Sequence, residues 1–194
     1  MIYQLTALMI LAAFYGCYFG KMLQQKKQGI QTDQMGKGKQ GREKAIETVL
    51  KIVTILVPVA EVACILNNCA PLPGFLRIAG LMVAALGVAA FVCSVVTMKD
   101  SWRAGVPEED KTSLVTDGIY RISRNPAFLG FDLVYAGILL AFFHWGLLVV
   151  SAAAAVMIHL QVCLVEEPFL CKAFGEEYMD YQEKVHRYLG RKKP

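Results

Sequence analysis

Apolar positions along the chain are gathered in five long stretches, with polar positions between them. The stretches cover residues 2–20, 46–66, 75–98, 127–143 and 145–165. A helix needs about 20 mainly apolar residues to cross the hydrocarbon core of a bilayer, and all five stretches meet or approach that length. The pattern predicts an all-α, polytopic membrane protein with about five transmembrane helices.

The final stretch of the chain has a different pattern. Apolar residues recur there at intervals of three and four: Leu170, Phe174, Tyr178, Tyr181, Val185 and Tyr188. This spacing is typical of an amphipathic helix, and we expect one over residues 166–189. Its aromatic face must be buried against the lipid headgroups or against the polar segment at 98–126.

Composition and charge agree with a membrane location. The chain is 56% hydrophobic and carries a formal net charge of +4 over 194 residues, with a mean hydropathy of +0.44. Nearly all of its basic residues lie in three polar stretches, at 21–44, 99–124 and 172–193, and five spans place these on one side. The positive-inside rule then predicts an outside N-terminus and a cytoplasmic C-terminus, and it explains the charge without a nucleic-acid partner. The stretch at 21–44, rich in Gln, Lys and Gly, is interpreted as a solvated loop.

Neither the cysteines nor the polar residues inside the spans form a metal-ligand set. The six cysteines show no C-x-x-C pair and no His at ligand spacing. Glu61, Asp132 and His159 lie inside apolar stretches, where an ionisable residue is a functional candidate by default. For Asp132, function and helix packing are equally good explanations, whereas His159 is better explained by a hydrogen bond between helices.

Two polar features are candidates for chemistry. The segment at 114–130 has a turn signal at Asp117-Gly118 and a helix start at Asn125-Pro126. A helix N-terminus with arginines nearby suits a carboxylate or a phosphate, although the same residues are also explained by helix initiation and topology. The second feature, Glu166-Glu167 at the end of the fifth span, either faces a cationic group or caps the helix that follows.

Taken in order, these residues resemble the R-H-P-x-Y … E-E signature of the isoprenylcysteine carboxyl methyltransferase family. The matching residues are Gly118-Ile119-Tyr120, Arg124-Asn125-Pro126-Ala127-Phe128, Glu166-Glu167 and Phe174-Gly175-Glu176-Glu177-Tyr178. The phospholipid N-methyltransferases are similar at a greater distance. The resemblance covers residues 98–189, with Asn125 in place of the usual histidine, Phe128 in place of the tyrosine and Val162 in place of an arginine found in eukaryotic members.

The resemblance implies S-adenosylmethionine as cofactor and assigns a role to each matching position. Leu114, Val115, Gly118 and Tyr120 would line the adenosine side, and Asn125, Pro126, Ala127, Phe128 and Leu129 the methionine side. Glu166 and Glu167 would hold the methionine ammonium or act on the acceptor, with Glu167 the better base for an acceptor that must lose a proton.

The resulting expectation is one integral membrane domain over residues 1–194. Residues 1–97 form a three-span scaffold, and residues 98–194 form the half that binds the cofactor. The predicted reaction transfers a methyl group to a lipophilic small molecule or prenylated protein, in contact with membrane lipid, with the carboxylate of a prenylated cysteine as the favoured acceptor. Three alternatives stay open: a phospholipid amine methyltransferase, an NADPH-dependent reductase of the sterol reductase type, and a non-catalytic lipid-binding protein.

Overall fold

The computed structural model describes residues 1–105 and 113–192, and this part of the chain folds into helices without strands. The long helices are α1 (Ile2–Lys27), α2 (Gly41–Leu66), α3 (Gly74–Met98), α4 (Pro126–Ala141) and α5 (Trp145–Gln161). The short ones are η1 (Lys99–Ser101), η2 (Gly118–Arg121), the π-helical turn η3 (Val162–Glu166), α6 (Glu167–Phe174) and α7 (Glu176–Lys184).

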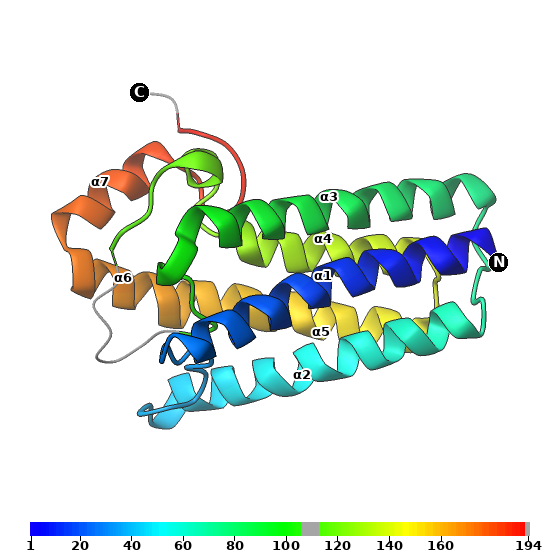
Figure 1. Ribbon diagram of the computed structural model, residues 1–194, viewed down its shortest axis with the longest axis horizontal. Coiled ribbons are helices and arrows are strands. Elements are labelled where there is room, and N and C mark those ends of the chain that lie inside the picture. The colour runs from blue at the N-terminus through cyan, green and yellow to red at the C-terminus, as the bar shows by residue number, and fades with distance from the viewer. Residues whose placement is uncertain (106–112, 193–194) are drawn as a thin grey trace.

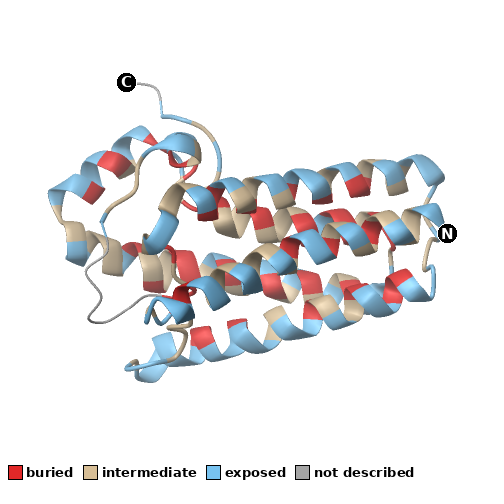
Figure 2. Ribbon diagram, viewed as in Figure 1, coloured by how far each residue is buried: buried red, intermediate tan, exposed pale blue. Residues whose placement is uncertain are grey.

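The five long helices lie side by side in one bundle, and all the short elements gather at one of its ends (Figure 1). We call this the site end; α1, α3 and α5 finish there, and α2 and α4 begin there. The N-terminus lies at the opposite end. Buried positions lie where helices face one another, whereas much of the outward surface is exposed (Figure 2).

Four helices of the described chain are long and apolar enough to cross a membrane. They are Ile2–Lys27, Gly41–Leu66, Gly74–Ser101 and Trp145–Phe174, the last of which continues α5 through η3 and α6. The fourth predicted span corresponds to α4, an apolar helix of 16 residues, roughly 24 Å long at 1.5 Å per residue. The all-helical fold with several candidate membrane spans is therefore confirmed, and the count of five spans stays a prediction.

Small residues allow α3 and α4 to pack closely. A Cβ atom built on Gly137 would lie 2.5 Å from the carbonyl oxygen of Gly80, and one built on Gly87 would lie 2.8 Å from that of Gly130. Such close approach between backbones is the usual way in which small residues drive helix association in membranes. The α3–α4 pair therefore holds the start of α4 in a fixed position.

Aromatic side chains fill the space between this pair and α1. The ring of Phe14 lies 4.8 Å from those of both Phe91 and Phe131, measured between centroids. Tyr18 and Trp102 make edge contacts with each other at 5.7 Å. This aromatic cluster packs α1 against α3 and α4 near the site end and supports the loops there.

The prediction of one continuous amphipathic helix over 166–189 is wrong. Two helices, α6 and α7, take its place, and Gly175 between them has a φ of +54°, a value that favours glycine. The chain changes direction at this residue. The turn brings Tyr178 and Tyr181 of α7 against Tyr120, so the aromatic face is buried against the 98–126 segment, one of the two positions expected for it.

The stretch at 21–44 is also more ordered than the predicted solvated loop. Helix α1 continues to Lys27, and Gln25 near its end is fully buried. The Thr32 hydroxyl donates to Gln25 Oε1 at 2.7 Å, and the backbone N–H of Gln34 donates to the Ala104 carbonyl at 2.8 Å. Long-range backbone pairing of this kind leaves no periodicity in the sequence, which explains the error.

Candidate functional site

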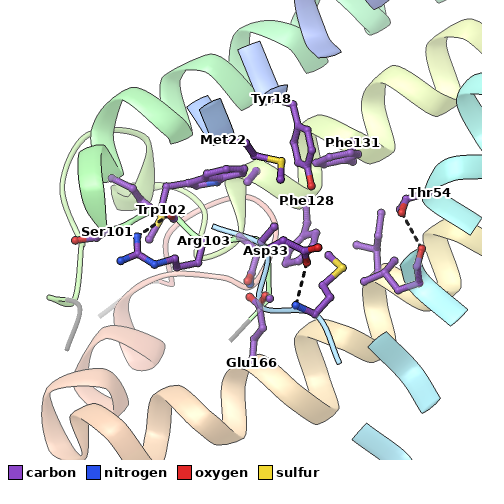
Figure 3. Close-up of a pocket in the computed structure, with 18 of the residues that line it drawn as sticks. Tyr18, Met22, Asp33, Thr54, Ser101, Trp102, Arg103, Phe128, Phe131 and Glu166 are labelled. Carbon is purple, nitrogen blue, oxygen red and sulfur yellow. Dashed lines mark hydrogen bonds between the residues drawn. The ribbon is translucent and has the colours of Figure 1, made fainter. Parts of the chain in front are cut away.

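A cavity of about 590 Å³ lies at the site end of the bundle (Figure 3). It is enclosed by three parts of the chain. Its lining includes Tyr15, Tyr18, Met22, Asp33, Lys51, Thr54 and Pro58 from the first part, Trp102, Arg103, Leu114, Val115, Tyr120, Arg124, Asn125 and Phe128 from the second, and Glu166, Phe174, Tyr178 and Tyr181 from the third.

Most of the residues that sequence reasoning selected meet at this cavity. Leu114, Val115, Tyr120, Asn125, Ala127, Phe128 and Glu166 line it, whereas Gly118, Pro126, Leu129 and Glu167 are absent from its lining. Gly118 starts η2 with a φ of +58°, and Pro126 is the first residue of α4. These two shape the backbone beside the cavity.

Tyr120 is held in the wall by hydrogen bonds at both of its ends. Its hydroxyl lies 2.6 Å from Ser94 Oγ on α3, and its carbonyl accepts from the Tyr181 hydroxyl at 2.6 Å. Burial raises the pKa of both phenols above their ordinary value. Both therefore remain neutral at physiological pH and present a fixed aromatic surface to the cavity.

Asn125 and Pro126 start α4 as the sequence indicates, but the asparagine side chain does not cap the helix. Its Nδ2 atom instead donates to the carbonyl of Arg187 at 3.1 Å. This bond ties the C-terminal tail to the start of α4. The tail thus closes one side of the site, which the sequence pattern did not reveal.

Glu167 is engaged by two arginines. Its Oε1 accepts from Arg124 at 2.6 Å, and its Oε2 accepts from Arg187 at 2.7 Å. Only 9% of the Glu167 side chain and 7% of the Arg124 side chain are exposed. The hydrogen bond to Glu167 is the main reason why the pKa of Arg187 is raised above its ordinary value.

This arrangement leaves positive charge beside the cavity. Arg124 lines the cavity, and its Nε is buried without a hydrogen-bond partner. A buried N–H group of a guanidinium is costly to leave unpaired. Because one carboxylate serves two arginines, the cluster suits an additional anion.

Glu166 points into the cavity, toward the region that Phe128 and Asp33 also face (Figure 3). Electrostatic interactions link it to Lys39 and Glu47. Glu47 is a fully buried acid that pairs with Lys39 and accepts from Gln161 Nε2 at 3.0 Å. The 28–40 segment and α2 therefore support the end of α5 from which Glu166 projects.

The N-terminal helices supply an apolar wall that sequence reasoning did not identify. Phe19 of α1 and Ile55 and Val59 of α2 line the cavity, yet 55%, 59% and 65% of these residues, respectively, are exposed. The cavity therefore reaches the lateral surface between α1 and α2. The aromatic residues of α1 were the one available signal, because Tyr15, Tyr18 and Phe19 interrupt an aliphatic stretch.

Over residues 1–105 and 113–192, no group of three or more His, Cys, Asp or Glu side chains is arranged to hold a metal ion. The polar groups of the site are instead carboxylates, guanidinium groups and phenols.

Comparison with known proteins shows which family the chain resembles. Residues 75–177 match the phospholipid methyltransferase family. Two curated rice proteins, from Oryza sativa subsp. indica and subsp. japonica, are each named a probable protein-S-isoprenylcysteine O-methyltransferase and are 29% identical over 117 residues. The match covers 59% of this chain and 61% of each relative, so the chain spans about three fifths of the length of these relatives.

The matched region contains the segment at 114–129, the glutamate pair and most of the third cavity wall. The helices long and apolar enough to cross a membrane are compatible with a family whose description names a phospholipid. The chain belongs to the phospholipid methyltransferase family.

Proposed function

We propose that the protein transfers a methyl group from S-adenosylmethionine to the carboxylate of a prenylated cysteine or a similar isoprenoid thioether. One observation carries the proposal. A single cavity joins a polar wall, built from residues of the matched family region, to an apolar wall that reaches the side of the bundle. A methyl donor and a lipophilic acceptor can meet in such a space.

The residues present fit the methyl donor. Bound there, S-adenosylmethionine supplies a methyl group on a sulfonium centre, together with a carboxylate, an ammonium and an adenine ring. The unpaired Nε of Arg124 suits the carboxylate, and Glu166 suits the ammonium. The aromatic surfaces of Tyr120, Tyr178 and Tyr181 suit the adenine ring and the cationic sulfur.

The surroundings of the two glutamates support separate roles. Glu166 faces the cavity and is placed to contact cofactor or acceptor. Glu167 fixes Arg124 and Arg187 and acts as a positioning residue. A carboxylate acceptor is already a nucleophile, so the contribution of the chain is to orient the reactants and exclude water.

Family membership favours methyl transfer over the reductase and the non-catalytic alternatives, and it leaves two acceptor classes. The rice relatives carry isoprenylcysteine in their names, and the family carries phospholipid in its description. The apolar wall between α1 and α2 suits either the isoprenoid tail of the first class or the acyl chains of the second. We place the N-terminus outside and the site end at the cytoplasmic face, where the basic loops lie.

The cofactor assignment is tested by calorimetric titration of S-adenosylhomocysteine into the detergent-solubilised protein. Tyr120→Ala and Glu166→Ala should each weaken binding at least tenfold, because each removes a side chain that lines the cavity. Glu183→Ala, at an exposed acid on α7 outside the matching signature, is the control and should bind as the parent does. Absence of binding by folded parent protein would overturn the proposal.

The acceptor is tested with a radiolabelled methyl donor and two substrates, a farnesylated cysteine and phosphatidylethanolamine. A carboxyl methyl ester releases methanol in alkali, whereas an N-methyl group does not. Alkali-labile label on the farnesylated cysteine is the expected result. Stable label on the phospholipid would replace our acceptor with the amine.

A further inference from the structure

A buried acid lies in the interior of the bundle, away from the glutamate pair. Glu61 of α2 is fully buried, and neither of its carboxylate oxygens has a hydrogen-bond partner. The hydroxyls of Tyr15 on α1 and Tyr135 on α4 are also buried without partners. Both phenols interact electrostatically with Glu61, and the Tyr15 and Tyr135 side chains also interact with each other, so the three groups lie near one another.

This cluster lies next to the cavity on each of the three helices. Tyr15 itself belongs to the cavity lining, and on α2 the lining residue Pro58 precedes Glu61 by three residues, which places both on the same side of the helix. On α4, the lining residue Phe131 makes an edge contact with Tyr135, with ring centroids 5.9 Å apart. Along α2 the cavity extends from Leu50 to Val59, roughly 14 Å at 1.5 Å per residue.

The chemistry of the cluster favours a neutral oxygen as its ligand. In the described part of the chain, no Lys or Arg side chain bonds to Glu61. A charged carboxylate that is buried without a cation is costly, so the neutral acid is favoured. The protonated acid and two phenols together present three O–H donors. A carbonyl or hydroxyl oxygen satisfies such a set, whereas a plain hydrocarbon leaves every donor unpaired.

We propose that Glu61, Tyr15 and Tyr135 form a second polar site that binds a hydroxyl or carbonyl group on the distal part of the acceptor's lipophilic tail. This inference rests on the proposed function, because it takes the tail to occupy the cavity. Among the isoprenoid acceptors of the proposed function, it favours those whose tail carries an oxygen over those, such as farnesylated cysteine, whose tail is a plain hydrocarbon. It also assigns a role to Glu61, a buried acid that takes no part in the proposed methyl transfer.

The experiment compares unsubstituted and ω-hydroxylated fatty acids of eight to sixteen carbons as probes. Binding is followed by tryptophan fluorescence in detergent, without turnover. At one chain length we expect the ω-hydroxy acid to bind about tenfold more tightly than its parent, because two or more hydrogen bonds are gained. Equal binding of both series at every length would overturn the proposal.

Variants test whether the preference for the ω-hydroxy acid depends on Glu61 and Tyr135. Glu61→Leu should abolish the preference while unsubstituted chains bind at least as well as before, and this variant removes an unpaired buried acid, so it should fold. Tyr135→Phe should reduce the preference several-fold. Tyr3→Phe is the control, because it changes a tyrosine of α1 that lies near Arg77, and it should retain the preference for the ω-hydroxy acid. A preference that survives in Glu61→Leu refutes the assignment.

Titration of S-adenosylhomocysteine into the same samples separates the two proposals. If the nucleoside binds but the hydroxyl preference is missing, the tail site is wrong and the methyltransferase reaction stands. If the preference is present but the nucleoside does not bind, the cofactor proposal is wrong and the polar tail site stands.

Discussion

Two adjacent glutamates at the end of α5 differ in what surrounds them. Glu167 lies between two guanidinium groups, whereas Glu166 lines the cavity. The sequence presents them as an equivalent pair. Their difference arises from the π-helical turn at Val162–Glu166, which changes the register of the side chains at the helix end.

Glu167→Gln should destabilise the protein, because it leaves Arg124 buried without its anion. Breaking a buried ion pair from one side costs about 3 kcal/mol, and we apply the estimate only to the Arg124 contact because Arg187 is 36% exposed. Glu166→Gln should leave the unfolding midpoint nearly unchanged and lower methyl transfer. Thermal unfolding and turnover of both variants provide the test, and a reversed pattern contradicts the assignment.

The buried phenols predict how stability responds to alkali. Burial raises the pKa of Tyr120, Tyr178 and Tyr181 in the folded protein, whereas the unfolded chain ionises near the ordinary value of 10.0. Their contribution to the free energy of unfolding is therefore complete below pH 10 and is lost as the pH rises above it. Chemical denaturation across this range should show a falling midpoint, with a smaller fall in Tyr181→Phe. An equally steep fall in that variant would contradict this role for Tyr181.

At the scale of helices, the α3–α4 pair depends on glycine. Gly137→Ala should force the two helices apart, since the added methyl group would meet the Gly80 carbonyl at 2.5 Å. Overpacking of this kind costs about 1–3 kcal/mol. We expect a lower unfolding temperature and weaker cofactor binding, because Asn125 lines the cavity directly before the start of α4.

Gly16→Ala is the matched control. Its added methyl group meets no atom within 4 Å, so the helix should be unchanged or slightly more stable. If both substitutions lower the unfolding temperature equally, close packing is not the reason for the glycine at 137.

The elements differ in how far the sequence predicts them. The long apolar helices agree with the predicted spans to within a few residues at most ends, because lipid-facing and buried positions are both apolar. The α1 extension to Lys27 was missed, since its polar last turns are stabilised by distant partners such as Trp102, whose carbonyl accepts from Gln25. The break at Gly175 was visible as a glycine within a periodic pattern, but only packing against Tyr120 required a turn there.

At the scale of the whole molecule, the cavity combines what the sequence can and cannot predict. The walls at 114–128 and Glu166 were predictable, because their residues follow one another in a recognisable order. The wall from α1 and α2 was not, since it depends on how distant helices pack and leaves no motif. The division of the chain into a scaffold over 1–97 and a catalytic half over 98–194 stays a prediction, although residues of both parts line the cavity.

The orientation in the membrane also belongs to this scale. A C-terminal green fluorescent protein fusion expressed in bacteria should fluoresce, and a C-terminal alkaline phosphatase fusion should be inactive, because the basic tail keeps that end in the cytoplasm. A phosphatase fusion after Asn68, between α2 and α3, should be active. The opposite pattern would place the site end outside.

The apolar wall on α1 and α2 lies wholly outside the region matched by the family. With the proposed function, the protein is modular, because the part proposed to recognise the lipid and the part proposed to perform the chemistry can change independently. Chimeras that exchange the first two helices between relatives offer protein engineers a direct route to altered lipid selectivity. Inhibitors aimed at this wall would gain selectivity that nucleoside analogues, which address the shared region, do not provide.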